Sequence, residues 1–329
     1  MEVGLTYDLR DERSSRPDAS PDYYGEFDTE ETIGYLEAAI ASAGHRVRRI
    51  GSVERLVRFI VEGGSVDIVF NIAEGVRGRN REAQVPALLE AWHIPYVFSD
   101  ALTMALCLDK AMTKRLFQHA KLPTPDFCVI SDVSELFGDL VDLPDFPLFV
   151  KPVHEGTSKG IDAGSVAVSP SDLSSRVEWV LDTYRQPALV ERYLAGPEFT
   201  VGVLGNGPEA RAIGALEVSV LDSNDGVYGF LQKEECETRV AYTPVGSAVL
   251  RDGLTKLAVK AYHVLECKDA GRVDIRLDEA GNMQLLEVNP LPGLHPTHSD
   301  LPMMAPYAGL SYEDMIGEIL CHSIKRWGL

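Results

Sequence analysis

The stretch "LLEVNPLPG", residues 285–293, is an apolar run that leads into a proline-rich turn. Side chains alternate across a β-strand, so Glu287 and Asn289 are expected to share one face. Leu286 and Val288 are then expected to share the opposite, apolar face. The sequence must therefore explain why a buried strand directs two oxygen-bearing groups, a carboxylate and an amide, to the same side.

The residues just before this strand predict a second strand that would pair with it. The segment "GRVDIRLDEAGNMQLLEVN", residues 271–289, resolves into two strands around the turn "DEAGN". If Asp274 lies opposite Glu287 in an antiparallel pair, Arg272 lies opposite Asn289, and all four side chains share one face. The opposite face would hold Val273, Ile275, Leu286 and Val288.

This register places two carboxylates and an amide within a few ångströms of one another. Such hard oxygen ligands suit Mg²⁺, which commonly bridges protein carboxylates and substrate phosphates. The set would be Asp274, Glu287 and Asn289. An alternative stays open, in which Arg272 and Arg276 neutralise the carboxylates on a solvated sheet face.

Two other segments offer groups that bind a nucleotide. In "FVKPVHEGTSKGI", residues 149–161, Lys151 ends an apolar strand and precedes a loop rich in glycine and hydroxyl groups, which suits an anion, although a surface hairpin loop is the alternative. In "ALVERYLAGPEFTV", residues 188–201, Glu191 follows a strand and Glu198 follows a Gly-Pro turn. That hinge could clasp an adenine through its backbone while Glu198 accepts ribose hydroxyls, or Glu198 could be a solvated turn residue.

The whole chain has the composition of an ordinary globular protein. Its 329 residues are 45% hydrophobic and 25% charged, which is enough for two or three domains with their own cores. The net charge of −19 argues against a nucleic-acid duplex or an anionic membrane as the main partner. The N-terminus lacks the pattern of a secretory signal. The five cysteines are scattered and form no CxxC pair, so we expect reduced thiols and a cytoplasmic location.

Hydrophobic spacing indicates how the elements follow one another. In the first hundred residues, strands alternate with helices, which predicts a small α/β domain; residues 66–72 fit a buried parallel strand, and residues 83–98 a helix followed by a strand. The polar segment of residues 10–28 fits a loop. Later come strands at residues 146–152 and 187–194, a strand-rich final third and a closing helix at residues 312–327.

Taken in order, "LDKAMTKRL", "VKPVHEGTSKG", "LVERYLAGPEFTV", "GRVDIRL" and "LLEVNPLPG" resemble the ATP-grasp superfamily and, within it, the D-alanine–D-alanine ligase family. The resemblance implies an α/β (α+β) protein with the ATP-grasp fold, in which three α/β domains hold ATP between two sheets. The implied domains are an N-terminal domain of residues 1–103, a central subdomain of residues 104–190 and a C-terminal subdomain of residues 191–329.

The resemblance also implies site residues. Those that would contact ATP are Lys110, Lys151, Glu155, Gly156, Glu191, Tyr193, Leu194, Glu198 and Lys233. Those that would bind two Mg²⁺ ions, or Mn²⁺ in their place, are Asp274, Glu287 and Asn289. The implied catalytic residues are Arg272, Gly293, Thr157 and Ser158.

The implied activity is ATP-dependent ligation. One amino acid would be activated as an acyl phosphate, and the amine of a second would displace phosphate, as in peptidoglycan biosynthesis. The partners would be small amino-acid substrates, with a homodimer as an expectation from the family. Two alternatives stay open: an ATP-grasp small-molecule kinase, and an ATP-binding regulatory module without turnover.

The departures from the family pattern concern the amino-acid substrates. The family's "HG…GEDG" segment is replaced by "NIAEGVRGRNREAQ", with Glu74 near the place of the histidine. In the lid, Glu234 follows Lys233 where a tyrosine is usual, and the last loop reads "LHPTHSDLP", with Ser299 near its end. Glu26 is a candidate for the glutamate that holds the first substrate's amino group. We therefore expect Glu26, Glu74 and Ser299 to contact substrate, and the first substrate to carry a cationic or hydroxyl group.

Overall fold

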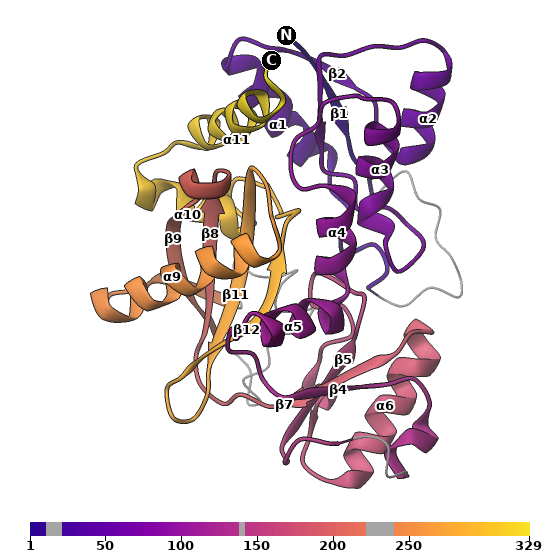
Figure 1. The fold of residues 1–329 in the computed structure, drawn as a ribbon, viewed down its shortest axis with the longest axis vertical. Coiled ribbons are helices and arrows are strands. Elements are labelled where there is room, and N and C mark those ends of the chain that lie inside the picture. Colours follow the sequence, from indigo (N-terminus) through magenta and orange to yellow (C-terminus); the bar gives the residue numbers. More distant parts are fainter. Residues whose placement is uncertain (11–21, 138–141, 222–239) are drawn as a thin grey trace.

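The computed structural model describes residues 1–10, 22–137, 142–221 and 240–329, and its strands form three sheets (Figure 1). The first sheet is parallel, in the order β2-β1-β3, and comprises β1 (Glu2–Thr6), β2 (Arg46–Arg49) and β3 (Ile68–Asn71). Its strands alternate with α1 (Glu30–Ser42) and α2 (Val53–Val61), and α3 (Gln84–Ala91) follows β3. The predicted alternation of strand and helix is confirmed.

The second sheet is antiparallel, in the order β4-β7-β5-β6. Its strands are β4 (Phe127–Ile130), β5 (Leu148–Pro152), β6 (Val166–Ala167) and β7 (Ala188–Arg192). Helix α6 (Pro170–Tyr184) begins where the Ser169 side chain accepts a hydrogen bond from the Asp172 amide, and it packs apolar residues against this sheet. Helices α4 (Ala101–Leu108) and α5 (Lys110–His119) connect the first sheet to the second.

The third sheet has five antiparallel strands in the order β10-β9-β8-β11-β12. The strands are β8 (Glu198–Leu204), β9 (Arg211–Val220), β10 (Val240–Pro244), β11 (Ala270–Leu277) and β12 (Met283–Asn289). Helix α9 (Ala248–Val264) covers one face and buries Leu254, Ala258 and Tyr262 against it (Figure 1). Part of the opposite face packs against residues 300–304, and part lines a cavity with the second sheet.

The pairing of β11 with β12 confirms the predicted register at its functional end. Asp274 lies opposite Glu287, and Arg272 lies opposite Asn289. The prediction that Leu286 packs on the apolar face is wrong, because a β-bulge shifts the register after Asp274 and pairs Ile275 with Leu285. The extra residue reverses the alternation, so Leu285 enters the core while Leu286 lines the cavity between the sheets.

The segment of residues 83–98 departs from its prediction in its second half. The helix is confirmed as α3, but Tyr96 forms an isolated parallel bridge with Val69 rather than a strand. Pro95 has no N–H to donate, and Phe98 has a φ of 75°, which turns the backbone out of the extended conformation. The predicted loop of residues 10–28 lies partly outside the described residues.

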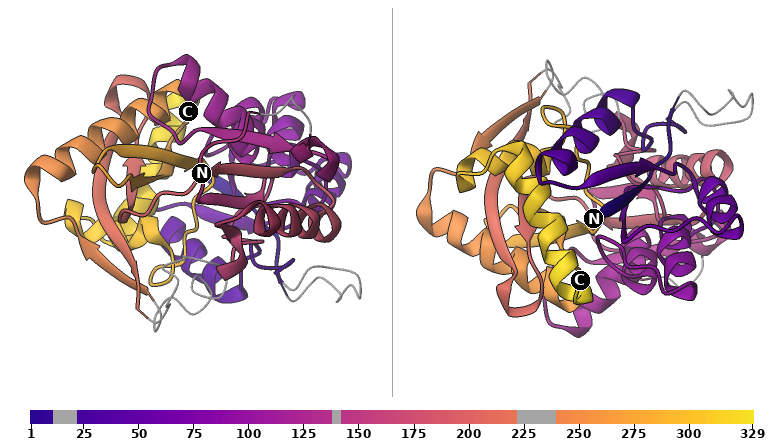
Figure 2. Two further views of the ribbon diagram at one scale, coloured as in Figure 1. Left: turned by 90° about the horizontal axis from the view of Figure 1, so that it is seen from below. Right: turned by 90° about the horizontal axis from the view of Figure 1, so that it is seen from above.

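The last helix returns to the first sheet. Helix α11 (Tyr312–Trp327) packs Met315, Ile316 and Ile319 into the same cluster as apolar residues of β1 and α1. The short helix α10 (Asp300–Met304) precedes it. Figure 2, seen from above, places α11 beside α1, with both chain ends on this side of the molecule.

A buried carboxylate fixes this return of the chain. Asp269 is fully buried and accepts hydrogen bonds from the Phe98 amide at 2.8 Å, from Asn206 Nδ2 at 2.8 Å and from Arg326 at 2.7 Å. Three distant segments are thereby held by one side chain. None of the helices in the described ranges has both the length and the apolar character that a bilayer-spanning helix requires.

Candidate active site

A cavity of about 90 Å³ lies between the second and third sheets. Its walls come from β5 and β7 on one side and from β8, β11 and β12 on the other. The predicted residues that line it are Lys110, Lys151, Glu155, Gly156, Ser158, Glu191, Tyr193, Leu194, Glu198, Arg272, Asp274 and Glu287. Side chains from separate sequence motifs therefore line one cavity. Lys233 lies outside the described residues.

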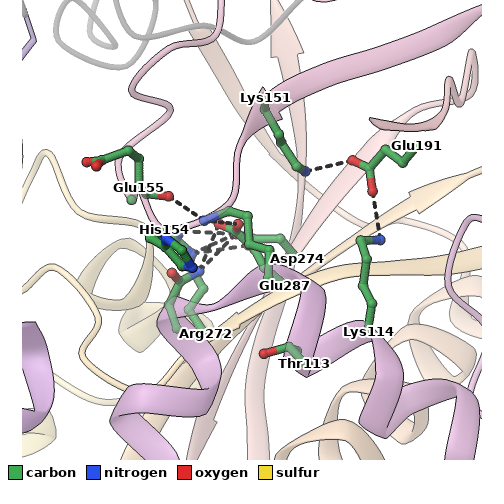
Figure 3. A network of polar contacts seen from close by, with 12 residues as sticks. Thr113, Lys114, Lys151, His154, Glu155, Glu191, Arg272, Asp274 and Glu287 are labelled. Carbon is green, nitrogen blue, oxygen red and sulfur yellow. Dashed lines mark hydrogen bonds and ion pairs between the residues drawn. The ribbon is translucent and has the colours of Figure 1, made fainter. Parts of the chain in front are cut away.

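At the back of this cavity a buried glutamate joins two lysines (Figure 3). Glu191 Oε1 lies 2.7 Å from Lys151 Nζ, and Glu191 Oε2 lies 2.8 Å from Lys114 Nζ. Burial alone would raise the pKa of Glu191, but the two ammonium groups outweigh it and lower the pKa to about 2. The carboxylate therefore stays charged and fixes the position of the Lys151 ammonium beside the cavity.

Sequence reasoning missed Lys114. It lies four residues after Lys110 in α5, so both side chains leave the same face of the helix. Its side chain is fully buried, and burial lowers the pKa of its ammonium group despite the neighbouring Glu191. The spacing of the two lysines in "DKAMTK" was the signal that could have identified it.

The oxygen-bearing groups of β11 and β12 converge at the other side of the cavity. Asn289 Nδ2 lies 3.2 Å from Asp274 Oδ2 and 3.3 Å from Glu287 Oε1, and Lys110 Nζ lies 3.4 Å from Glu287 Oε2. Burial raises the pKa of Asp274, and the adjacent Glu287 raises it further. This excess of negative charge, on hard oxygen donors, fits a divalent cation.

The donor set also indicates which cation fits. Among the described residues, no group of three or more His, Cys, Asp or Glu side chains is arranged to hold a metal ion on its own. The two carboxylates and one amide would need further oxygen ligands from water or from a bound phosphate. Mg²⁺ is bound in this way in many phosphoryl-transfer sites.

Arg272 stands between this cavity and a second one. Its guanidinium lies 2.9 Å from Asp274 Oδ2 and 3.0 Å from Asp300 Oδ2. Burial would lower its pKa, but the two carboxylates raise it, so the group keeps its charge. Arg272 therefore pairs with Asp274, and Arg276 pairs with Glu198 at 3.3 Å; because Asp274 and Arg272 are buried, this sheet face is not the solvated face of the alternative.

The glycine-rich loop is held by a buried network from the first part of the chain. Glu26 accepts hydrogen bonds from Arg81 and from the Gly156 amide, both at 2.7 Å, and pairs with Lys159 at 2.9 Å. Burial would raise the pKa of Glu26, but Arg81 and Lys159 lower it to about 2. Its carboxylate is thus fully engaged, and Lys110 donates to the Glu155 carbonyl of the same loop.

The second cavity, of about 330 Å³, adjoins the first and shares Lys110, Gly156, Arg272 and Asp300 with it. The remaining predicted residues lie here: Glu26, Glu74, Thr157, Asn289, Gly293 and Ser299. A Cβ atom at Gly293 would lie 2.7 Å from Ser299 Oγ, so a larger residue here would make the Ser299 side chain move. Sequence reasoning missed Glu82, a buried carboxylate that also lines this cavity.

Comparisons with known proteins agree with this geometry. A sequence model of the family described as "D-ala D-ala ligase C-terminus" matches residues 116–321. The D-alanine–D-alanine ligase of Marinobacter nauticus is 36% identical over 287 residues, which cover 86% of this chain and 82% of that protein. An uncharacterized protein of Sinorhizobium fredii is 33% identical over 268 residues, 79% of this chain and 75% of its own length.

Solved structures give the same fold. The crystal structure of D-alanine–D-alanine ligase from Bacillus anthracis complexed with ATP has a TM-score of 0.74 with 19% sequence identity. The match covers 100% of this chain and 99% of that chain. The predicted ATP-grasp fold is confirmed.

Proposed function

The chain belongs to the D-alanine–D-alanine ligase family, and we propose that it joins two amino acids through an amide bond at the expense of ATP. The observation that carries the proposal is the shared boundary of the two cavities at Lys110 and Arg272. The first cavity offers cations for the phosphates of a nucleoside triphosphate and oxygen ligands for its metal ion. The second cavity offers space for an amino acid. A carboxylate bound at the boundary would meet the terminal phosphate.

The proposed reaction has two steps. The carboxylate of the first amino acid attacks the γ-phosphorus of ATP, the bond from that phosphorus to the bridging oxygen of ADP breaks, and an acyl phosphate forms. The uncharged amine of the second amino acid then attacks the acyl carbon, phosphate leaves with the bonding electrons, and the amine gives up a proton. The products are ADP, phosphate and the amide.

Each step relies on charged groups that the fold holds in place. Lys110 and Lys151 would contact the phosphates, and Glu191 with Lys114 fixes Lys151. Mg²⁺ bound by Asp274, Glu287 and Asn289 would offset charge on the phosphoryl oxygens. Arg272 and the Gly293 amide would stabilise the oxyanion of the tetrahedral intermediate, because both lie at the cavity that would bind the acyl group.

Binding of ATP requires the first cavity to widen. Its volume of about 90 Å³ is well below the roughly 300 Å³ of the smallest ordinary ligand pockets. The Arg276 guanidinium lies 5.5 Å from the centre of the Tyr193 ring, at the strand end where the adenine would enter. We propose that Arg276 moves aside when the nucleotide binds, while Glu198 becomes free to accept ribose hydroxyls.

Three finer features belong to the same proposal. We propose that the site holds two Mg²⁺ ions, that the protein forms a homodimer and that it acts in the cytoplasm. Metal titration in the presence of a non-hydrolysable ATP analogue, light scattering after size exclusion, and fluorescent tagging in cells test these statements separately.

The experiment that tests the function is an ATP turnover screen with D- and L-amino acids, singly and in pairs. We expect free phosphate only when an amine substrate is present, and a product whose mass equals the two amino acids less one water. A stable phosphoester without free phosphate would identify a kinase. ATP binding without turnover for every pair would identify a regulatory module.

A further inference from the structure

Among the described residues, three carboxylates of the second cavity have no hydrogen-bond or ion-pair partner. The Glu82 side chain is buried, with 8% of the residue exposed, and it lines the cavity together with Glu74 and Asp28. Throughout the ranges that the structure describes, none of these three carboxylates makes a hydrogen bond or an ion pair. A carboxylate as buried as that of Glu82 is normally paired, and Glu74 and Asp28 are partly buried, so this cavity is arranged for a partner that the described residues do not supply.

A neighbouring glutamate shows what a partner would do. Burial raises the pKa of Glu82 and of Asp28 to about 7, and it raises the pKa of Glu74 well above its ordinary value. Glu26 is equally buried, but the cations of Arg81 and Lys159 lower its pKa to about 2. Arg81 also acts to lower the pKa of Glu82 and of Glu74, but burial outweighs it, so a positively charged ligand against these carboxylates would supply the charge that they lack.

The three carboxylates line one cavity, and this cavity meets the ATP cavity at Lys110 and Arg272. The charge of Arg81 and, to a smaller extent, that of Lys110 act on Glu82, while the charges of Glu82 and Asp28 act on Glu74. Arg10, whose charge acts on Asp28, lines the same cavity and donates to the carbonyls of Phe27 and Gly25 at 2.8 and 3.1 Å.

Two other occupants fit these carboxylates less well. A metal ion held by Glu82, Glu74 and Asp28 would need the three to form a metal-binding group, and the described residues contain no group of three or more His, Cys, Asp or Glu side chains arranged in that way. An amino acid with an uncharged side chain brings one ammonium group, which sits next to its carboxylate and leaves the other acidic groups without a cation. The volume of about 330 Å³ leaves room for a longer side chain.

We propose that the first substrate is a diamino acid, that is, an α-amino acid whose side chain ends in a second cationic group. Its α-carboxylate lies at Lys110 and Arg272, its α-ammonium faces Glu82, and its side-chain cation faces Glu74 and Asp28. The inference rests on the proposed ligase function, because that function places the substrate carboxylate at the boundary of the two cavities.

The test compares amino acids that differ in one charge. Lysine, ornithine and 2,4-diaminobutyrate are compared with norleucine, norvaline and 2-aminobutyrate, each as both enantiomers, and D-alanine is included. Binding is measured by calorimetry with Mg²⁺ and a non-hydrolysable ATP analogue, and turnover by phosphate release with ATP. We expect at least one diamino acid to bind roughly 30-fold or more tightly than its uncharged counterpart.

Three variants locate the effect. Glu74→Gln should weaken binding of the diamino acid roughly 10-fold or more and leave that of the uncharged counterpart nearly unchanged. Glu82→Gln should weaken both, because both carry the α-ammonium. Glu178→Gln, at an exposed position of α6, is the matched control and should change neither.

The outcomes separate the two proposals. If D-alanine or an uncharged amino acid binds as tightly as the diamino acids, or if Glu74→Gln affects both classes alike, the substrate inference is wrong while the ligase function stands. If a diamino acid binds tightly but no pair of amino acids releases phosphate, the second cavity binds diamino acids and the ligase function is wrong. Absence of binding by every diamino acid overturns the substrate inference.

Discussion

Replacing Glu82 by glutamine should stabilise the protein without ligand, although it removes a group proposed to bind substrate. The Glu82 carboxylate is buried, has no partner within the described part of the chain and lies near Glu26 and Glu74. Glutamine has nearly the same shape as the protonated acid and cannot ionise. A buried carboxylate destabilises the folded protein, and the substitution removes this destabilisation.

The magnitude follows from the pKa of Glu82, which burial raises from its ordinary 4.5 to about 7. Below pH 4.5 the group is protonated in both the folded and the unfolded chain, so the substitution has little effect there. As the pH rises to about 7, the unfolded chain ionises before the folded one, and stability falls. Near pH 8 the whole difference between the two pKa values applies, and it corresponds to about 3 kcal/mol. Near pH 5 only about 1 kcal/mol of it has developed.

The assay is urea unfolding of Glu82→Gln and of the wild type near pH 5 and near pH 8. We expect the variant to be more stable at both pH values, with a gain that is about 2 kcal/mol larger near pH 8. Glu178→Gln, at an exposed site, should show no such dependence on pH. A Glu82→Gln variant that is less stable than the wild type near pH 8 would refute the reasoning, because it would mean that the carboxylate is stabilised where it lies.

Three further predictions concern other parts of the molecule. Lys114→Met leaves Glu191 with one cation and should lower the free energy of unfolding by about 3 to 5 kcal/mol in urea; a loss below about 1 kcal/mol would contradict the role of this pair. Asp274→Asn should reduce ATP-dependent phosphate release roughly 100-fold or more while the circular dichroism spectrum is unchanged, and retained Mg²⁺-dependent turnover would exclude Asp274 as a ligand. Asp269→Ala leaves Arg326 and two other donors without their acceptor, so it should lower the free energy of unfolding by about 3 to 5 kcal/mol in the same urea assay, whereas a wild-type midpoint would contradict its clamping role.

The sequence predicted the pairing of β11 with β12 because alternation and a short turn together determine a local register. Asp274 opposite Glu287 is confirmed for that reason. The bulge at Leu286 could not be predicted, since an extra residue in an apolar run changes neither composition nor the turn. Alternation therefore placed one side chain on the wrong face.

The partners of buried charges were harder to predict than the charged residues themselves. Glu191 was expected at the adenine hinge, but nothing in its motif indicates that Lys114, 77 positions earlier, lies against its side chain. Glu26 was expected to hold substrate, and the structure shows its carboxylate engaged by Arg81 and Lys159. Such contacts depend on how the three sheets are placed relative to one another, and local patterns carry no information about that placement.

The return of α11 to the first sheet affects the order in which the protein can fold during synthesis. The apolar face of α1 is completed by side chains of a helix that begins about 270 residues after α1 ends. At a translation rate of roughly 5 to 20 residues per second, the ribosome needs about 14 to 54 s to deliver that helix. During this interval the nascent first sheet exposes apolar surface to which chaperones can bind. If synthesis stalled before α11 is made, the fragment would keep this surface exposed and would be prone to aggregate.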